Sequence, residues 1–388
     1  MNTFETDKQY VANTYSRFPI EVVSGKGAEV QDIDGNEYID LGSGIAVNTF
    51  GIADEPWIEA VTKQLNAFQH TSNLYYSRPC ADLAALICKR TGMSKVFFGN
   101  SGAEANECAI KVARKYAAQK KGEDFYTIIT LKNSFHGRTL TTLAATGQDV
   151  FHSQFLPLTP GFVHVEANNI EDLHKKVKEN KVAGIMFECV QGEGGVLPLE
   201  QAFVCEMRKI ADDEDIVLIA DEVQTGNGRC GQLYAYMNYG ITPDVFTTAK
   251  GLGGGLPIGA CVMSEKTADV LASSDHGSTF GGNPVACAGA LNILGRIDDA
   301  LLENVRKKSD MIFDKLSGSA GIVSVTGMGL MIGIETQKNA SEVITECMKN
   351  GVLVIKAKNK VRLLPPLNIS YEQLDHALDV IKDACKIN

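Results

Sequence analysis

The sequence predicts an α/β fold in which a mostly parallel central sheet carries helices on both faces, with a smaller α+β domain beside it. Short apolar runs alternate with helical segments between about residues 95 and 297, the order typical of a doubly wound sheet. Residues 216–220 are apolar without interruption, as expected for a strand that is buried on both faces. From about residue 300 onward, helices and short strands follow one another in an α+β order.

These patterns divide the chain into three segments. We expect residues 1–50 to form an N-terminal arm and hairpin that belong to the small domain. Residues 51–297 should form the large domain, and residues 298–388 the C-terminal small α+β domain. The hairpin is indicated by alternating apolar and polar residues around Asp34-Gly35-Asn36, a favoured turn sequence.

Within the large domain each element follows from a local pattern. Helical periodicity predicts helices over residues 55–68 and 79–91, the second with proline at its start. The strand at 259–263 should return across the sheet. The predicted strands span residues 95–98, 125–131, 162–165, 184–190, 216–220, 244–248 and 259–263, and further helices begin near residues 101, 170, 200 and 284.

Composition narrows the class of protein. Of the 388 residues, 44% are hydrophobic and 22% are charged, which is ordinary for a soluble globular protein. The net charge of −10 and the lack of a basic stretch argue against nucleic-acid and membrane partners. The ten cysteines include no C-x-x-C pair and no histidine cluster at metal-ligand spacing, so we expect reduced thiols, no metal and a cytoplasmic location.

Asp221 and Lys250 each follow a predicted strand, so they should lie close together at the carboxyl edge of the sheet. A lysine in such a place can form a Schiff base with pyridoxal phosphate, and a carboxylate can keep the pyridine nitrogen protonated. The plain alternative is a strand-end acid beside a surface lysine. These two residues alone leave both interpretations open.

Other polar residues gather at predicted strand ends. Residues 99–104 turn a strand into a helix whose N-terminus can bind an anion, although Ser101 would also serve as an ordinary N-cap. Phe135, His136 and Arg138 surround a glycine turn, and Glu193 lies in a second glycine-rich turn. Taken singly, Phe135 is as well explained as a core residue and His136 as a brace for its loop.

Six motifs together carry more weight than any one of them, because a single short motif is a common false positive. In chain order they are NSGAEANECAIKVAR, FHGRT, QGEGG, IADEVQTGNGR, TTAKGLGGGLPIGA and STFGGNPVACA. In order and spacing the chain resembles, nearly end to end, the class III (ω-aminotransferase-like) family of fold-type I pyridoxal-phosphate enzymes. The resemblance implies pyridoxal 5'-phosphate as cofactor and a homodimer with active sites at the subunit interface.

The resemblance also implies a role for individual residues. Lys250 would hold the cofactor covalently and then act as the general base, and Asp221 would pair with the ring nitrogen. Val223 and Phe135 would cover the two faces of the ring, and Gln224 would reach its hydroxyl. The phosphate would be held by Ser101, Gly102, Ala103 and, from the partner subunit, Thr279.

Three residues bear on the substrate. Arg138 matches the arginine that binds the donor's α-carboxylate in the ornithine and acetylornithine members, and a planar guanidinium suits a carboxylate. Glu193 and Arg362 match a pair in which the glutamate covers the arginine during reaction of the ω-amine donor. The glutamate would then uncover the arginine for 2-oxoglutarate or glutamate.

Further positions favour an acylated donor. Gly44 lies where the free-ornithine enzymes carry a tyrosine, and residues 70–76 look like the substrate-side loop of the acetylornithine branch. Ser278 is the remaining predicted substrate-binding residue. Ile52 stands where many relatives have histidine, which bears on fine specificity rather than on the chemistry.

The expected reaction is the conversion of N2-acetyl-L-ornithine and 2-oxoglutarate to N-acetyl-L-glutamate 5-semialdehyde and L-glutamate, a step of arginine biosynthesis. Succinylornithine, N-succinyl-diaminopimelate, ornithine and 4-aminobutyrate are alternative donors within the same family. A catalytically silent homologue that binds a small molecule is the non-enzyme alternative. Intact Lys250 and Asp221 count against it, because a silent protein has no chemical need for either.

Overall fold

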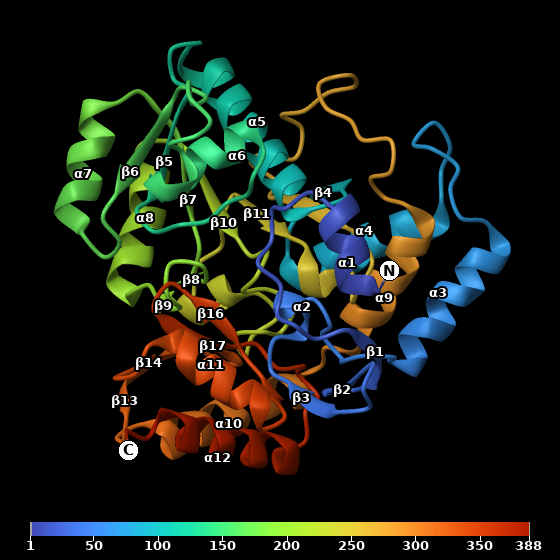
Figure 1. Cartoon of the computed structure of the whole chain (residues 1–388). Helices are drawn as coiled ribbons and strands as arrows, with labels where there is room; N and C mark the ends of the chain where they lie inside the picture. The colour runs from blue at the N-terminus through green and yellow to red at the C-terminus, as the bar shows by residue number, and fades with distance from the viewer. Residues whose placement is uncertain (1, 388) are drawn as a thin grey trace.

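The computed structural model describes residues 2–387, and its described part contains one large sheet and two smaller four-stranded sheets (Figure 1). The large sheet has the strand order β4-β12-β11-β10-β7-β5-β6. β12 runs antiparallel to both of its neighbours, whereas the other pairs are parallel, which confirms the predicted mostly parallel sheet with one returning strand. The strands are β4 (Lys95–Gly99), β5 (Thr127–Leu131), β6 (Phe162–Val165), β7 (Val182–Phe187), β10 (Val217–Asp221), β11 (Val245–Thr248) and β12 (Gly259–Met263).

The apolar run in β10 explains why helices cover both faces of this sheet. All five residues of β10 are buried, and alternate side chains enter different apolar layers. Val217 and Ile219 pack with α5, whereas Leu218 and Ala220 pack in the layer that includes α4, α8 and α9. The helices of this part are α3 (Glu55–Ala67), α4 (Arg78–Thr91), α5 (Gly102–Lys121), α6 (Leu140–Ala145), α7 (Ile170–Glu179), α8 (Gln201–Asp213) and α9 (Pro284–Arg296).

In the lower part of Figure 1 the N-terminal strands lie beside elements from the C-terminal part of the chain. β3 pairs in parallel with β15, so the predicted N-terminal hairpin belongs to the same sheet as a strand from the other end of the chain. The domain boundaries at residues 50 and 297 stay a prediction. The elements are β1 (Val22–Lys26), β2 (Glu29–Asp32), β3 (Glu37–Asp40), α10 (Asp299–Leu316), β13 (Ile322–Met328), β14 (Met331–Thr336), α11 (Ala340–Lys349), β15 (Val352–Leu353), β16 (Ile355–Ala357), β17 (Lys360–Leu363) and α12 (Tyr371–Cys385).

Several local structures differ from simple pattern expectations. The N-terminal arm contains a capped helix, α1 (Thr3–Tyr10), none of whose residues is buried. The glycine-containing loop after β3 forms α2 (Ser43–Ala46), a turn in which φ is positive at all four residues. The predicted strand over 184–190 ends at Phe187, and a short ribbon, β8 (Val190–Gln191) with β9 (Leu197–Pro198), follows.

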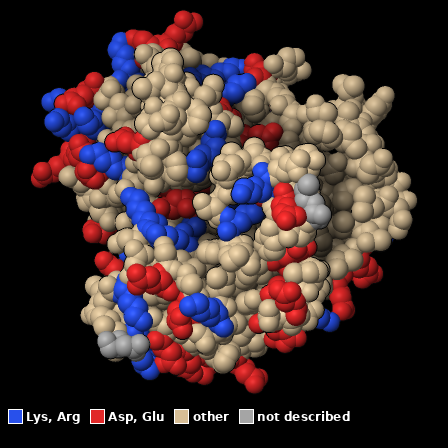
Figure 2. Space-filling model, in the orientation of Figure 1, with Lys and Arg blue, Asp and Glu red and all other residues tan. Residues whose placement is uncertain are grey.

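Surface charges, cysteines, helix hydrophobicity and potential metal ligands describe the general character of the molecule. Figure 2 shows lysine and arginine side chains around a hollow near the centre of the face, with acidic side chains spread over its rim and lower edge. Seven of the ten cysteines are buried, and all ten are free thiols. Among the described residues no helix is long and apolar enough to cross a membrane, and no cluster of acidic, histidine and cysteine side chains could hold a metal ion.

Glu222 is a fully buried carboxylate directly beyond β10, and it fixes the next loop. Its Oε2 accepts hydrogen bonds from the backbone N–H of Ala235 at 2.8 Å and from the hydroxyl of Thr225 at 2.7 Å. Its Oε1 accepts one from the backbone N–H of Tyr236 at 2.7 Å. Burial raises the pKa of Glu222 to about 7, although these donors oppose the rise. The loop between β10 and η2 (Ala235–Tyr239) therefore depends on one side chain.

We expect Glu222→Gln to lower the free energy of unfolding by about 1–3 kcal/mol, because an amide group must face a buried backbone N–H and leave it unpaired. Since the folded-state pKa lies above the usual 4.5, Glu222 makes the wild type lose stability as pH rises from about 5 to 7. The variant should lack this part of the dependence of stability on pH. Chemical denaturation at several pH values measures both effects, with the exposed Glu123→Gln as control. Equal stability of E222Q and wild type would contradict the assignment.

Candidate active site

A cleft of about 610 Å³ lies at the carboxyl ends of β10 and β11. It brings together most of the side chains that the sequence singles out, although they come from segments up to 149 residues apart (Ser101 to Lys250). The predicted site residues that line it are Ser101, Gly102, Ala103, Phe135, Arg138, Glu193, Asp221, Val223, Gln224 and Lys250.

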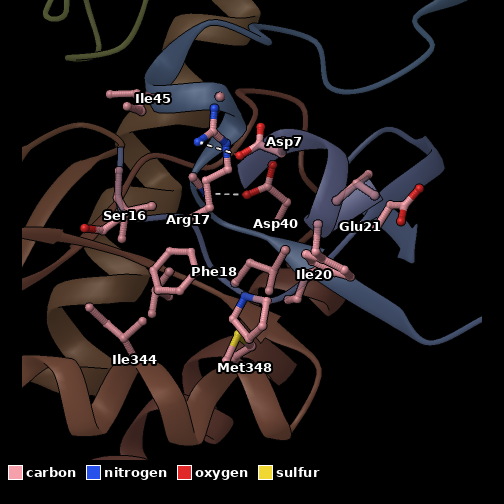
Figure 3. A pocket seen from close by; sticks show the side chains of 18 of the residues that line it. Asp7, Ser16, Arg17, Phe18, Ile20, Glu21, Asp40, Ile45, Ile344 and Met348 are labelled. Atoms are coloured by element: carbon pink, nitrogen blue, oxygen red, sulfur yellow. Dashed lines mark hydrogen bonds and ion pairs between the residues drawn. The ribbon is translucent and has the colours of Figure 1, made fainter. Parts of the chain in front are cut away.

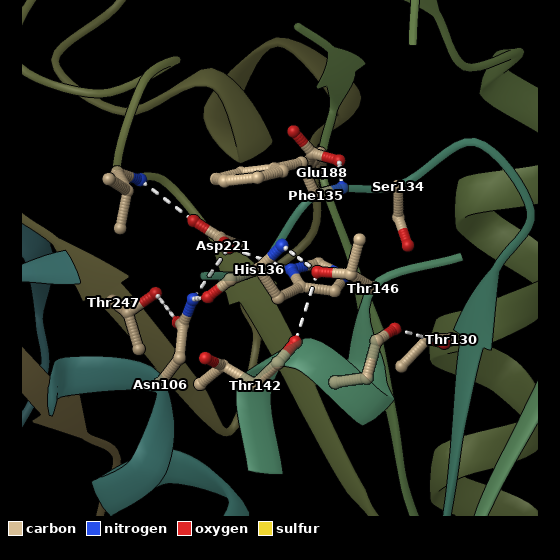
Figure 4. Close-up of polar contacts among 12 residues, drawn as sticks. Asn106, Thr130, Ser134, Phe135, His136, Thr142, Thr146, Glu188, Asp221 and Thr247 are labelled. Atoms are coloured by element: carbon tan, nitrogen blue, oxygen red, sulfur yellow. Dashed lines mark hydrogen bonds and ion pairs between the residues drawn. The ribbon is translucent and has the colours of Figure 1, made fainter. Parts of the chain in front are cut away.

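Asp221 lines this cleft, and its buried carboxylate is the centre of a group of hydrogen bonds (Figure 4). Its Oδ2 accepts hydrogen bonds from Nδ2 of Asn106 at 2.9 Å and from Nδ1 of His136 at 2.8 Å, and its Oδ1 accepts one from the backbone N–H of Val223 at 3.0 Å. Burial disfavours a charged His136, but the hydrogen bond and charge of Asp221 outweigh it and raise the pKa of the imidazole. Asp221 is thus held as an oriented, hydrogen-bonded acid.

Two side chains from distant segments fix the backbone around Lys250, which has a positive φ of 43°. The hydroxyl of Thr49 donates to the carbonyl of Gly251 at 2.8 Å. The amide of Asn227 donates to the hydroxyl of Thr248 at 3.0 Å and to the carbonyl of Ala249 at 3.3 Å. A non-glycine residue adopts such a conformation only when its surroundings impose it. These contacts supply that constraint.

The charge environment suits a lysine that works as a free amine. Burial lowers the pKa of Lys250; Glu193 opposes this effect and Arg362 adds to it. A lower pKa increases the neutral fraction, and only a neutral amine can act as a nucleophile or take up a proton.

The N-terminus of α5 lines the same cleft. Ser101 is its N-cap and accepts a hydrogen bond from the backbone N–H of Glu104 at 3.2 Å. The N-cap role predicted for Ser101 is therefore confirmed, and this role is compatible with binding a phosphate. A Cβ on Gly102 would come within 2.6 Å of the side chain of Val223. Glycine therefore allows the helix start to lie directly against the wall formed by Val223.

Arg362 does not line the cleft but lies just behind Glu193 and Gln224. Its Nη1 is 2.6 Å from Oε1 of Glu193 and 3.2 Å from Oε1 of Gln224. The side chain of Arg362 is 3% exposed, whereas that of Glu193 is 30% exposed. The structure thus pairs the two residues that the sequence predicts as a pair, with the carboxylate between the arginine and solvent.

Arg138 differs from Arg362 in its surroundings. It is exposed at the cleft, and among residues 2–387 it makes no hydrogen bond or ion pair through its guanidinium. Its Cζ lies 4.0 Å from the ring centroid of Phe151 and 5.5 Å from that of Phe135. The donors of this guanidinium are therefore free to bind an anion.

Gly44, Ser278 and Thr279 lie outside the lining of this cleft. Gly44 lines a second cavity of about 680 Å³ between the N-terminal arm and α11, where Phe18, Ile344 and Met348 make it largely apolar (Figure 3). Ser278 accepts a hydrogen bond from Asn100, next to the start of α5, and Thr279 is exposed. The second cavity contains no lysine, so we place the chemistry in the cleft around Lys250.

Sequence reasoning assigned no site role to several residues that the structure places here. Asn106 lies within a quoted motif, one helical turn after Gly102, and this spacing could have revealed it. Glu188 is buried and accepts hydrogen bonds from the backbone N–H of Phe135 and of Gly192. Burial raises its pKa to about 7. Tyr15 reaches the cleft from the N-terminal arm, and no local pattern indicates this.

A buried carboxylate, a buried lysine and a helix N-terminus in one cleft of a doubly wound sheet are the groups that a lysine-dependent pyridoxal-phosphate enzyme requires. The family model described as Aminotransferase class-III matches residues 10–385. The chain belongs to the class III aminotransferases. It is therefore a transferase that depends on pyridoxal phosphate, as a related structure with this cofactor at its active site also indicates.

Individual relatives are similar over almost the whole chain. The acetylornithine aminotransferase of Haemophilus ducreyi is 48% identical over 97% of this chain and 96% of its own length. The solved ornithine aminotransferase of Toxoplasma gondii superimposes with a TM-score of 0.94 at 30% identity, covering 98% and 94% of the two chains. The solved N-acetylornithine aminotransferase of Stenotrophomonas maltophilia gives a TM-score of 0.84 at 33% identity and covers 98% of each chain.

The residues present fit the cofactor. The cleft contains an acid for the ring nitrogen, an amine for the aldehyde, and an aromatic and an aliphatic side chain in Phe135 and Val223. The close approach of Gly102 to Val223 leaves the first N–H groups of α5 at the edge of the cleft, where they can bind a phosphate.

We expect Thr49→Val to reduce turnover about tenfold at saturating cofactor, because the carbonyl of Gly251 loses its donor and the backbone at Lys250 is less well held. Cofactor binding should persist, since Asp221 and the α5 N-terminus are unchanged. Steady-state rates and the visible absorption of bound cofactor measure the two effects separately. The exposed Thr62→Val serves as the matched control. A turnover number equal to that of the wild type would disprove the positioning role of Thr49.

Proposed function

We propose that this enzyme transfers the ω-amino group of N2-acetyl-L-ornithine to 2-oxoglutarate, giving N-acetyl-L-glutamate 5-semialdehyde and L-glutamate, as a cytoplasmic step of arginine biosynthesis. The observation that carries the proposal is the exposed guanidinium of Arg138, which shares one cleft with Lys250 and has no acidic partner among the described residues. A donor with an α-carboxylate at one end and an amine at the other can span these two groups. The names of the relatives at 40–48% identity support the same donor.

The cofactor would be held by residues of the cleft and its neighbourhood. Bound pyridoxal phosphate supplies an electron sink for the charge that remains when a C–H bond next to the amine is broken. Asp221, oriented by Asn106 and His136, would keep the ring nitrogen protonated. Val223 and Phe135 would enclose the ring, Gln224 would reach its hydroxyl, and the phosphate would bind at Ser101, Gly102 and Ala103.

The protein's own groups would carry the proton transfers. The amine of Lys250 would remove the proton from the donor carbon that carries the amino group and deliver it to C4′ of the cofactor. Its lowered pKa favours the neutral form that this step needs. Its position on a backbone held by Thr49 and Asn227 would keep the amine at a fixed place in the cleft.

Glu193 and Arg362 would allow one pocket to accept two kinds of substrate. While Glu193 covers Arg362, the only free guanidinium in the cleft lining described here is that of Arg138, so an α-carboxylate binds there and the ω-amine points to Lys250. When Glu193 moves away, Arg362 would bind the α-carboxylate of glutamate or 2-oxoglutarate. The roles proposed for Gly44, which would leave room for an acylated donor end, and for Ser278 rest on the resemblance alone, because both residues lie outside the lining of the cleft.

We further propose a homodimer with an active site at each side of the interface. Leu74, Tyr76 and Phe280 are large, exposed apolar or aromatic side chains on neighbouring loops, and such a patch is typical of a protein interface. Thr279 is exposed beside them and would reach the phosphate bound by the partner subunit.

The donor can be tested by recording the visible spectrum of the holoenzyme while single amino donors are added without a keto acid. We expect N2-acetyl-L-ornithine to remove the band of the lysine-bound cofactor at concentrations where ornithine and 4-aminobutyrate leave it unchanged, because only the first combines the α-carboxylate with the acylated amine. If the band responds best to ornithine or 4-aminobutyrate, the proposed donor is wrong, although the reaction at Lys250 is not contradicted.

Glu193→Gln should slow the half-reaction with N2-acetyl-L-ornithine more than that with L-glutamate. Without the negative charge, Arg362 competes for the donor carboxylate and holds the molecule in an unproductive direction. Single-turnover kinetics of each half-reaction, with Glu123→Gln as control, give the two rates. If both half-reactions are slowed by the same factor, Glu193 only shapes its loop.

A further inference from the structure

Phe151 lies at the end of η1 (Asp149–Phe151), outside every motif that the sequence singles out, yet its ring contacts the free guanidinium of the cleft. The 4.0 Å from Cζ of Arg138 to the ring centroid is well within the range of a cation–π contact. Phe135 lies 5.8 Å from Phe151 in an edge-to-face arrangement and is itself 5.5 Å from Arg138. Two aromatic rings thus adjoin a cation that has no acidic partner among residues 2–387.

The backbone on both sides of Phe151 is anchored. The backbone N–H of Phe151 donates to the carbonyl of Gln148 at 3.1 Å, and the amide of Gln148 donates to the carbonyl of Ser134 at 3.0 Å. His152 is buried, and its Nε2 lies 2.7 Å from the carbonyl of Thr146. Because a carbonyl only accepts, this nitrogen must carry the proton and donate. The backbone that carries Phe151 is therefore held close to the loop that carries Arg138.

A guanidinium that stacks on a ring keeps its N–H groups at the edge of its plane, where they can form a forked pair of hydrogen bonds with a carboxylate. An acidic partner would orient the arginine equally well, but it would neutralise the charge and occupy those donors. An aromatic ring orients the cation and leaves the donors free. This arrangement suits the reversible binding of an anion.

We propose that Phe151 is a specificity-determining positioning residue, which holds Arg138 in the orientation that binds the α-carboxylate of the amino donor. This inference rests on the proposed function, because it takes a donor carboxylate as the ligand of Arg138. Phe151 acts through Arg138 and does not bind the carboxylate itself. Its loss should therefore matter only for ligands that carry the carboxylate.

The test compares holoenzyme variants with two donors that differ in one group. N-acetylputrescine has the chain and acylated amine of N2-acetyl-L-ornithine but lacks the carboxylate. For Phe151→Leu we expect KM for N2-acetyl-L-ornithine to rise about three- to tenfold with little change in kcat, as expected for the loss of one cation–π contact. The rate with N-acetylputrescine and the visible band of the cofactor should stay as in the wild type.

Three further variants separate positioning from packing. Phe151→Tyr keeps the ring and should restore a wild-type KM. Phe151→Met, similar in volume but without a π face, should behave as Phe151→Leu and serves if that variant fails to fold. In an Arg138→Met background, Phe151→Leu should cause no further loss, because a residue that acts only through Arg138 has nothing left to position. Isothermal titration with N-acetyl-L-norvaline, which has the carboxylate but no ω-amine, should show the same three- to tenfold weakening without any turnover.

The results that would contradict the inference differ from those that would contradict the proposed donor. Equal losses with both donors, or additive losses in the double variant, would show that Phe151 only packs the loop and would overturn the inference. A wild-type preference for N2-acetyl-L-ornithine over N-acetylputrescine that survives Phe151→Leu unchanged would overturn the inference alone. A wild-type enzyme without that preference would overturn the proposed donor and the inference with it.

Discussion

The buried carboxylate of Asp221 is the group on which the cleft depends. A carboxylate in a dry interior costs several kcal/mol unless donors surround it. Here the donors come from α5, from the turn after β5 and from the backbone just beyond β10. Satisfying one acid therefore fixes three segments relative to one another. The same segments carry Gly102, Phe135 and Val223, which line the cleft.

The two arginines at the site illustrate how burial decides what a charge requires. Arg362 is almost fully buried, so it needs a counter-charge, and Glu193 provides one at 2.6 Å. Arg138 is exposed, so solvent supports its charge and two aromatic rings suffice to orient it. Because Arg362 is buried, moving Glu193 away leaves its charge uncompensated unless an incoming anion takes the place of the glutamate. An exposed, stacked arginine can exchange ligands without such a requirement.

Local sequence patterns predict much of this molecule. The apolar run of β10, the return of β12 and the glycine turn at the start of α5 all appear where propensity and periodicity place them. The end of β7 could not be predicted, because Glu188 follows an apolar run that continues into Cys189 and Val190. The chain leaves the sheet there, and the carboxylate of Glu188 accepts hydrogen bonds from the backbone N–H of Phe135 and of Gly192. Phe135 lies far away in the sequence, so a local pattern cannot reveal this contact.

The sequence by itself determined the class of chemistry. Asp221 and Lys250 stand at strand ends that periodicity identifies, and six motifs in order identify the family. Only the tertiary structure decided other contacts: Thr49 with Gly251, Asn227 with Ala249, and Phe151 with Arg138. The physical reason is that strands and helices form from interactions between near neighbours in the chain. Contacts across tens or hundreds of residues depend on how the packed layers bring distant loops together, and no local pattern records that.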